Sequence, residues 1–358
     1  MMLSDDVRRF LERHNLIDLA KSSVKVSERV FKECVAPKKE RILIIGDVGA
    51  SNRRISPALA TSFYLAAKNL KLNVDLFLQT PAIFGQKAHE AVVGAMDTLD
   101  ENSIILLFLS SRLGEMGKLG NSFRTFVKSR NHRFMSAPSL GCLETSRYPD
   151  LIKAIDIDYK DIQQRGLKLK EALDAASEVR VTTKAGTDFT MKIDGMNSIA
   201  NIADYRLPGS GGNMPCGEVY IAPKGKENVF GKVVVDVSLC FREGTILLKR
   251  PVTMYLDKGS LVKMEGSPEG LYLRDTITWA ESRSKMPENV AKVCELGIGI
   301  NKNAKAAGAT VLDEKALGTA HIAFGSNYWF GGPIYALTHF DQVFKNPKIE
   351  ADGKVVKI

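Results

Sequence analysis

The first half of the chain alternates short apolar runs with segments of helical periodicity. Continuous apolar runs are typical of strands buried in a parallel sheet, and they occur at 41–47, 73–79 and 103–111, with a possible fourth at 132–138. Apolar residues three and four positions apart predict helices, at 4–35 (two helices), 56–70 and 84–99. Strands that alternate with helices indicate an α/β domain with a mostly parallel sheet.

The pattern changes near residue 176. A charged segment of helical periodicity at 150–176 predicts a helix that bridges two domains. After it, apolar and polar positions alternate, and 178–195 predicts a hairpin that turns at Ala185-Gly186. Further strand-like runs follow at roughly the 8–12-residue spacing of short antiparallel strands. We therefore expect a mostly parallel α/β domain at 1–176 and a β-rich α+β domain at 177–358.

Composition narrows the class of protein. With 44% apolar and 25% charged residues the chain has the balance of a soluble globular protein. No apolar run approaches the roughly 20 residues that span a bilayer, and the first residues, MMLSDDVRRFLERH, lack the apolar run of a signal peptide. We expect a cytoplasmic protein with no membrane contact. The five cysteines are scattered and none forms a C-x-x-C pair, which argues against a disulfide framework or a cysteine zinc site.

Neither the charge nor the first glycine motif indicates nucleic acid or nucleotide binding. The net charge is +9, but basic residues are interleaved with acidic ones, as in KKER at 38–41, and no nucleic-acid recognition motif is present. GDVGAS at 46–51 follows a predicted strand but lacks the third glycine of a dinucleotide fingerprint. A solvated basic surface and a tight turn explain these features.

The candidate chemistry is concentrated near the C-terminus. His339 and Asp341 are spaced i, i+2 in the strand-like run IYALTHFDQV, so their side chains share one face of a strand. His321 begins a second apolar run, and Gly331-Gly332-Pro333 between the runs can turn the chain back. Two adjacent strands would then present two imidazoles and one carboxylate, an incomplete metal site.

Two glutamates further upstream can complete this site. Glu218 lies in GGNMPCGEVY and Glu295 in VCELGIGIN, both glycine-rich and apolar contexts. Taken alone, either glutamate is best explained as a surface charge, and a single histidine as a structural residue. A buried carboxylate, however, needs a cation or hydrogen bonds. Together with Tyr328 these groups supply ligands for divalent zinc, cobalt or manganese. Five carboxylate and imidazole groups suit two ions roughly 3.5–4 Å apart that share a bridging water.

These residues resemble a known family. The chain is similar over most of its length to the thermophilic metallo-aminopeptidases of the T and S type. The motifs that carry the resemblance are ETSRYPDLIKAIDIDY (144–159), GTD (186–188), NMPCGEVYIAP (213–223), ELGIGIN (295–301), HIAFG (321–325) and HFD (339–341). The resemblance implies an α/β N-terminal domain, a metal-binding catalytic C-terminal domain and a homodimer. It also implies metal ligation by Glu218, Glu295, His321, Tyr328, His339 and Asp341, with Glu295 bridging two ions.

The implied activity is hydrolysis of N-terminal residues from peptides by a metal-activated water. Glu218 or Glu295 would move the proton of that water, and Tyr328 would donate a hydrogen bond to the oxyanion. The chain is shorter than typical members, and only 18 positions separate His321 from His339. The same superfamily is similar to the dihydroxypyridine ring-cleaving dioxygenases, which use one Fe(II) held by two histidines and a carboxylate, so such a dioxygenase is the alternative. A non-catalytic binding protein of the same fold is a third possibility.

Overall fold

The computed structural model describes residues 5–83, 85–120 and 122–358. Residues 1–4 lie outside the described residues; they belong to the N-terminal segment that lacks a signal-peptide pattern, and residue 4 is the first of the helices predicted at 4–35. Residue 84, the first of the helix predicted at 84–99, also lies outside them. The helices are α1 (Asp5–Arg13), α2 (Ile17–Ser22), α3 (Val24–Val30), α4 (Ile55–Asn69), α5 (Glu90–Asp97), α6 (Phe123–Ser129), α7 (Tyr148–Ile155), α8 (Tyr159–Asp174), α9 (Gly270–Glu281) and α10 (Thr310–Asp313).

The strands fall into two groups along the chain. The first group, with one later addition, is β1 (Ile42–Asp47), β2 (Val74–Gln79), β3 (Ile104–Phe108), β4 (Arg133–Ala137) and β8 (Gly211–Asn213). The second is β5 (Glu178–Thr182), β6 (Asp188–Lys192), β7 (Ile199–Asn201), β9 (Glu218–Ile221), β10 (Val229–Val235), β11 (Ser238–Phe241), β12 (Gly244–Leu247), β13 (Val252–Asp257), β14 (Ser260–Gly266), β15 (Val293–Gly299), β16 (Thr319–Gly325), β17 (His339–Lys345), β18 (Lys348–Ala351) and β19 (Lys354–Val355).

The chain forms two compact units, 5–159 with 203–216, and 160–202 with 217–358. The domain boundary predicted after residue 176 stays a prediction. The predicted helix at 150–176 is divided into α7 and α8, and α5 begins only at Glu90, where the His89 side chain accepts a hydrogen bond from Ala91 N as an N-cap. None of the helices in the described ranges is both long and apolar enough to cross a membrane.

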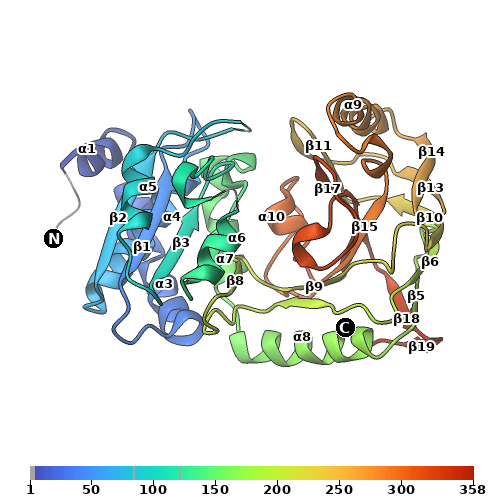
Figure 1. Cartoon of the computed structure of the whole chain (residues 1–358), viewed down its shortest axis with the longest axis horizontal. Coiled ribbons are helices and arrows are strands. Elements are labelled where there is room, and N and C mark those ends of the chain that lie inside the picture. Colours follow the sequence, from blue (N-terminus) through green and yellow to red (C-terminus); the bar gives the residue numbers. More distant parts are fainter. Residues whose placement is uncertain (1–4, 84, 121) are drawn as a thin grey trace. The chain divides into compact units, whose positions relative to one another are not determined.

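The first unit is built on a parallel sheet in the order β2-β1-β3-β4-β8 (Figure 1). Alternate residues of β1 face opposite sides, as the pleat requires. Leu43 and Ile45 pack into a buried cluster that includes Val92 of α5, while Gly46 lies against Ala60 of α4. Helices on both faces explain why β1 is apolar throughout, and they confirm the α/β pattern predicted for this half.

The second unit contains two antiparallel sheets. Their strand orders are β14-β13-β10-β6-β5-β18-β19 and β12-β11-β17-β16-β15-β9-β7. β5 and β6 form the predicted hairpin, and Gly186 in its turn has a φ of +107°, which a glycine adopts readily. The described chain is therefore a mixed α/β protein. In the second of these sheets β15, β16 and β17 are neighbours, which matters for the chemistry below.

Candidate metal centre

Three adjacent strands of one sheet carry most of the chemistry predicted from the sequence. β16 pairs with β15 along one edge and with β17 along the other, antiparallel in both cases. The cross-strand pairs are Glu295–Ala323, Ala323–Asp341, Gly297–His321 and Gly325–His339. Because every second side chain along a strand points to the same face, this register directs both histidines and both carboxylates to one side of the sheet.

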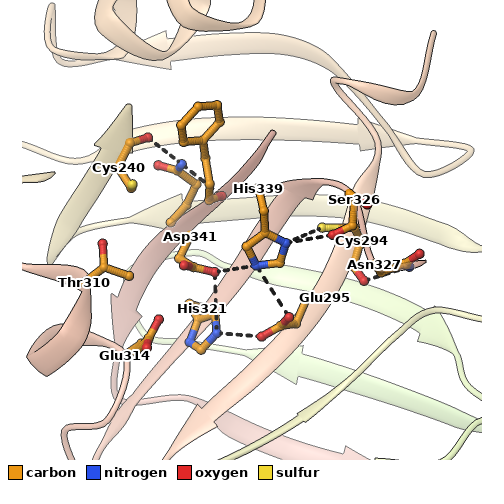
Figure 2. Close-up of polar contacts among 12 residues, drawn as sticks. Cys240, Cys294, Glu295, Thr310, Glu314, His321, Ser326, Asn327, His339 and Asp341 are labelled. Atoms are coloured by element: carbon orange, nitrogen blue, oxygen red, sulfur yellow. Dashed lines mark hydrogen bonds and ion pairs between the residues drawn. The ribbon is translucent and has the colours of Figure 1, made fainter. Parts of the chain in front are cut away.

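The four side chains converge on a common centre (Figure 2). His321 Nε2 lies 3.2 Å from Glu295 Oε1 and 3.8 Å from Asp341 Oδ1. His339 Nε2 lies 3.2 Å from the same Asp341 oxygen and 3.5 Å from Glu295 Oε2. Each imidazole therefore faces both carboxylates, and each carboxylate faces both imidazoles.

Small residues make room for this arrangement. A Cβ atom added to Gly297 would lie 2.1 Å from His321 Cε1, so the ring of His321 fills the space above the glycine. The smallest chiral side chain, Ala323, stands between Glu295 and Asp341 in the cross-strand row. Gly297 in the sequence ELGIG has no side chain, so the imidazole of His321 can pack over β15.

An irregularity in β15 brings a cysteine to the same centre. The pairing with β16 shifts register between Val293 and Glu295, which is the signature of a bulge. As a result the Sγ atom of Cys294 lies 3.4 Å from His339 Nδ1, while the neighbouring Glu295 faces His339 Nε2. Burial raises the pKa of the Cys294 thiol, so the sulfur is a neutral contact at physiological pH.

Backbone contacts fix the orientation of the His339 ring. Its Nδ1 lies 2.8 Å from the carbonyl oxygen of Ser326, the geometry of an Nδ1–H donor. The loop that carries this carbonyl is held by buried Asn327, whose Nδ2 donates to Cys294 O and whose Oδ1 accepts from Ile334 N. With the proton on Nδ1, the lone pair of Nε2 is directed at the carboxylates, as in many metal-ligating histidines.

The centre is buried and strongly coupled. His321 is fully buried, and Glu295 and Asp341 are 6% and 8% exposed. Burial alone would lower the pKa of His321, but the hydrogen bond that its ring donates to Glu295 and the charge of Asp341 raise it to about 9. Burial alone would raise the pKa of Asp341, but the adjacent His339 and His321 hold it well below its usual range.

The pKa of His339 is raised, like that of His321. Burial opposes the charged ring, but Cys294 and Asp341 beside it raise the pKa of His339 well above its ordinary value. The two carboxylates therefore attract positive charge to this point, either as protons on the imidazoles or as a cation in their place.

A second acidic group lies beside the first. Ligand atoms of Glu218, Glu314 and His321 all lie within 4.8 Å of one another. In Figure 2 Glu314 lies on the left of the His321 ring and Glu295 on its right. The ammonium of Lys315, which is fully buried, forms ion pairs with both Glu218 and Glu314. Lys315 already supplies positive charge to this second group.

The four converging side chains, Glu295, His321, His339 and Asp341, fit a divalent metal ion. Asp341 Oδ1 and His321 Nδ1 are buried polar atoms without a hydrogen-bond partner among the described residues. Ligand atoms of Glu295, His321 and Asp341 lie within 4.8 Å of one another, and His339 Nε2 faces the same carboxylates. Two imidazoles and a carboxylate on one side of an ion form the facial triad of non-haem Fe(II) oxygenases, which leaves other coordination positions open.

Comparisons with known proteins identify the family. A family model described as 2,5-dihydroxypyridine 5,6-dioxygenase matches residues 22–357. The chain belongs to this family. A 2,5-dihydroxypyridine 5,6-dioxygenase of Pseudomonas putida strain KT2440 is 24% identical over 217 residues, which cover 58% of this chain and 60% of that protein's length. The solved structure of the 2,5-dihydroxypyridine dioxygenase from Pseudomonas putida KT2440 has a similar fold, with a TM-score of 0.72, 18% identity, and coverage of 94% of this chain and 95% of that one.

Membership of the dihydroxypyridine dioxygenase family corrects the main interpretation of the sequence. The family match and the sequence relative contradict assignment to the T and S type aminopeptidases, and with it the hydrolase and protease predictions. The main interpretation inferred the reaction from the motifs HFD, HIAFG and ELGIGIN. These motifs supply candidate metal ligands on three strands, and such a set of ligands does not by itself specify the reaction. The family is consistent with a divalent metal, but zinc, cobalt or manganese and a pair of ions per chain find no support.

The structure brings together four of the six predicted ligands, Glu295, His321, His339 and Asp341. Glu218 is buried nearby, but its carboxylate is paired with Lys315. Tyr328 lies at the surface, 69% exposed, and its ring meets Tyr335 edge to face at 5.9 Å. Their predicted roles as ligands stay predictions.

Sequence reasoning missed four contributors to this part of the fold, namely Cys294, Glu314, Lys315 and the Ser326 carbonyl. A signal existed for two of them. Glu314 and Lys315 follow Asp313 in the run TVLDEKALG, where apolar residues flank three consecutive charged ones, and charged residues that are buried are usually paired. The Ser326 carbonyl had no signal, because any residue type supplies the same backbone atom.

Proposed function

We propose that this protein is an Fe(II)-dependent dioxygenase that opens the ring of a dihydroxylated pyridine. The observation that carries the proposal is the approach of three atoms, His321 Nε2, His339 Nε2 and Asp341 Oδ1, with the nitrogens 3.8 and 3.2 Å from that oxygen. Family membership supports the choice of reaction. In this reaction both atoms of O2 enter the product and the ring bond between C5 and C6 is broken.

His321, His339 and Asp341 would hold the iron. Ferrous iron supplies the one-electron chemistry that lets O2 react with an electron-rich ring. The chain's own groups set the geometry: Ser326 O fixes the tautomer of His339, and the open backbone at Gly297 lets His321 lie flat over β15. Rigid strands rather than loops carry all three ligands, which favours a well-defined site.

Glu295 has a separate role in this proposal. Its two oxygens face different imidazoles, at 3.2 Å from His321 and 3.5 Å from His339, so it spans the pair and supplies a second carboxylate next to the triad. A triad needs one carboxylate. Glu295 is therefore the group in place to accept the proton of a ring hydroxyl as the substrate binds.

The test is reconstitution of the purified protein with Fe(II) under anaerobic conditions, followed by addition of oxygenated buffer and 2,5-dihydroxypyridine. We expect oxygen uptake equal to the substrate consumed, with two atoms of labelled oxygen in the ring-opened product. His339→Ala should abolish uptake, whereas His14→Gln, outside the metal centre, should retain it. Iron bound at one equivalent without oxygen uptake would exclude the proposed reaction on this substrate. The homodimer and the cytoplasmic location remain expectations, which sedimentation of the purified protein and fractionation of cells that produce it would test.

A further inference from the structure

The loop between β16 and β17 exposes three large aromatic rings, and one of them, Trp329, lies against His339 of the metal centre. Tyr328, Trp329 and Tyr335 are 69%, 45% and 58% exposed. Burial of such rings is strongly favourable, so a group of exposed aromatic side chains marks a surface that contacts another molecule. We call Tyr328–Tyr335 the aromatic loop.

The aromatic loop is anchored at its base although its side chains are exposed. Asn327 is fully buried and accepts three backbone hydrogen bonds, from Phe330 N and Gly332 N at its carbonyl and from Ile334 N at its side chain. Phe330 turns inward and meets Tyr220 edge to face at 5.2 Å. The exposed rings are therefore presented by a fixed loop, which reduces the entropy lost when a ligand binds.

Trp329 stands at the accessible side of the metal centre. Its ring centroid lies 4.8 Å from that of His339, at an angle of 63° between the planes. Counting side-chain atoms alone, His339 is 20% exposed, whereas Asp341, Glu295 and His321 are 11%, 7% and 0% exposed. A molecule that reaches the centre from solvent thus approaches on the His339 side, where half of the indole is still uncovered.

We propose that Trp329 is a substrate-positioning residue whose indole forms the wall against which a planar, electron-rich N-heteroaromatic ring lies as it enters the metal centre. This inference rests on the proposed function, because that function makes the ligand a flat ring. Offset or edge-to-face packing of two aromatic rings adds binding energy beyond the area buried and selects planar ligands over saturated ones of the same size.

The two tryptophans of the chain, Trp279 and Trp329, allow a direct test. Trp279 belongs to α9 and packs against Arg242 and Arg283, so Trp279→Phe leaves Trp329 as the single indole without touching the metal centre. We would titrate 2,5-dihydroxypyridine without oxygen into the iron-loaded variant and follow tryptophan emission. Trp329→Phe, which keeps Trp279, is the matched control for absorption of light by the ligand.

The expected result is saturable quenching in Trp279→Phe and none in Trp329→Phe. A saturated six-membered ring with two hydroxyl groups should not quench either variant. Trp329→Leu should raise the dissociation constant and KM roughly tenfold, with kcat within about twofold and iron content unchanged. Trp329→Phe, which retains a flat ring, should recover most of the affinity.

The outcomes separate this inference from the proposed function. Ring binding that quenches Trp329, without turnover, would keep the inference and reject the dioxygenase reaction. Turnover with no quenching and an unchanged KM in Trp329→Leu would keep the reaction and reject the inference. Loss of self-association in Trp329→Leu, with ligand affinity unchanged, would also reject it, because the exposed rings would then cover a second copy of the chain.

Discussion

The imidazole of His321 occupies the space above Gly297 on the neighbouring strand. The two residues are directly paired between β15 and β16, and a methyl group at position 297 would lie 2.1 Å from His321 Cε1 and 2.2 Å from its Nε2. These separations are far below van der Waals contact. Residue 297 must therefore lack a side chain for His321 Nε2 to lie beside Glu295 and Asp341.

Gly297→Ala should consequently displace the His321 ring and weaken metal binding. We expect iron content after reconstitution to fall by at least about tenfold while the far-UV circular dichroism spectrum is kept, since one rotated side chain does not unfold the sheet. Gly94→Ala in α5 is the matched control, because no atom lies within 4 Å of its added Cβ. Wild-type iron content in Gly297→Ala would show that His321 is not a ligand.

This relationship marks the limit of sequence reasoning for the site. The i, i+2 spacing of His339 and Asp341 predicted their common face, and the structure has them on β17 with that register. Glycines around Glu295 predicted close packing. The partner of Gly297 could not be predicted, because strand pairing between residues 24 positions apart depends on the whole sheet.

The fold could be predicted more fully than the reaction. Apolar runs located β1 to β3, and strict alternation located β5 and β6, since burial on two faces or on one face leaves different periods. The reaction depends on how many ions the carboxylates hold. Glu218 was predicted to serve a second ion, and its contact with Lys315, 97 positions later in the chain, could not be predicted from the sequence.

The two carboxylates of the metal centre should differ in their effects when neutralised. Asp341 Oδ1 faces both imidazoles and has no hydrogen-bond partner among the described residues, so Asp341→Asn should lose most of the bound iron. Glu295→Gln keeps a similar shape, so it should retain at least half of the iron but slow oxygen uptake by about 10²–10⁴-fold, the usual effect of losing a general base. Metal analysis and oxygen-electrode rates on the same preparations give both values. The reverse pattern, iron lost in Glu295→Gln and kept in Asp341→Asn, would exchange the two roles.

Lys315 should be essential for stability because it is the cation of a buried acidic group. Its side chain is 1% exposed and pairs with Glu218 and Glu314, and those carboxylates raise its pKa although burial opposes the charge. Lys315→Met leaves Glu218 and Glu314 without this cation, and removal of one partner of a buried ion pair costs about 3–5 kcal/mol. Thermal unfolding should show a clearly lowered midpoint.

A double variant separates lost charge from lost packing. Glu218→Gln combined with Lys315→Met removes the lysine and one of its two carboxylate partners and leaves only Glu314, so it should be more stable than Lys315→Met alone. Arg180→Met, at an exposed ion pair with Asp188, is the control and should change stability by less than about 1 kcal/mol. Equal midpoints for the single and double variants would place the cost in packing and not in charge.

Stability of the first unit should fall in mild acid because of His132. The ring is fully buried beside Phe126, at 5.3 Å between centroids, and neither nitrogen has a hydrogen-bond partner among the described residues. Burial, with a further contribution from Arg130, lowers the pKa of His132 to about 4. The unfolded chain has a histidine pKa of about 6.5, so between those values it binds a proton that the folded chain does not.

The sign of the effect follows from that difference in protons. The contribution of neutral His132 is fully present above about pH 6.5 and is lost as the pH falls toward 4, up to about 3 kcal/mol. His132→Phe removes the titrating group, so the stability difference between variant and wild type should be constant above pH 7 and shift in favour of the variant on acidification. Unfolding in urea at intervals from pH 8 to pH 4.5 measures this difference directly. A difference that stays constant over the whole range would mean that His132 has the same pKa in the folded and the unfolded protein.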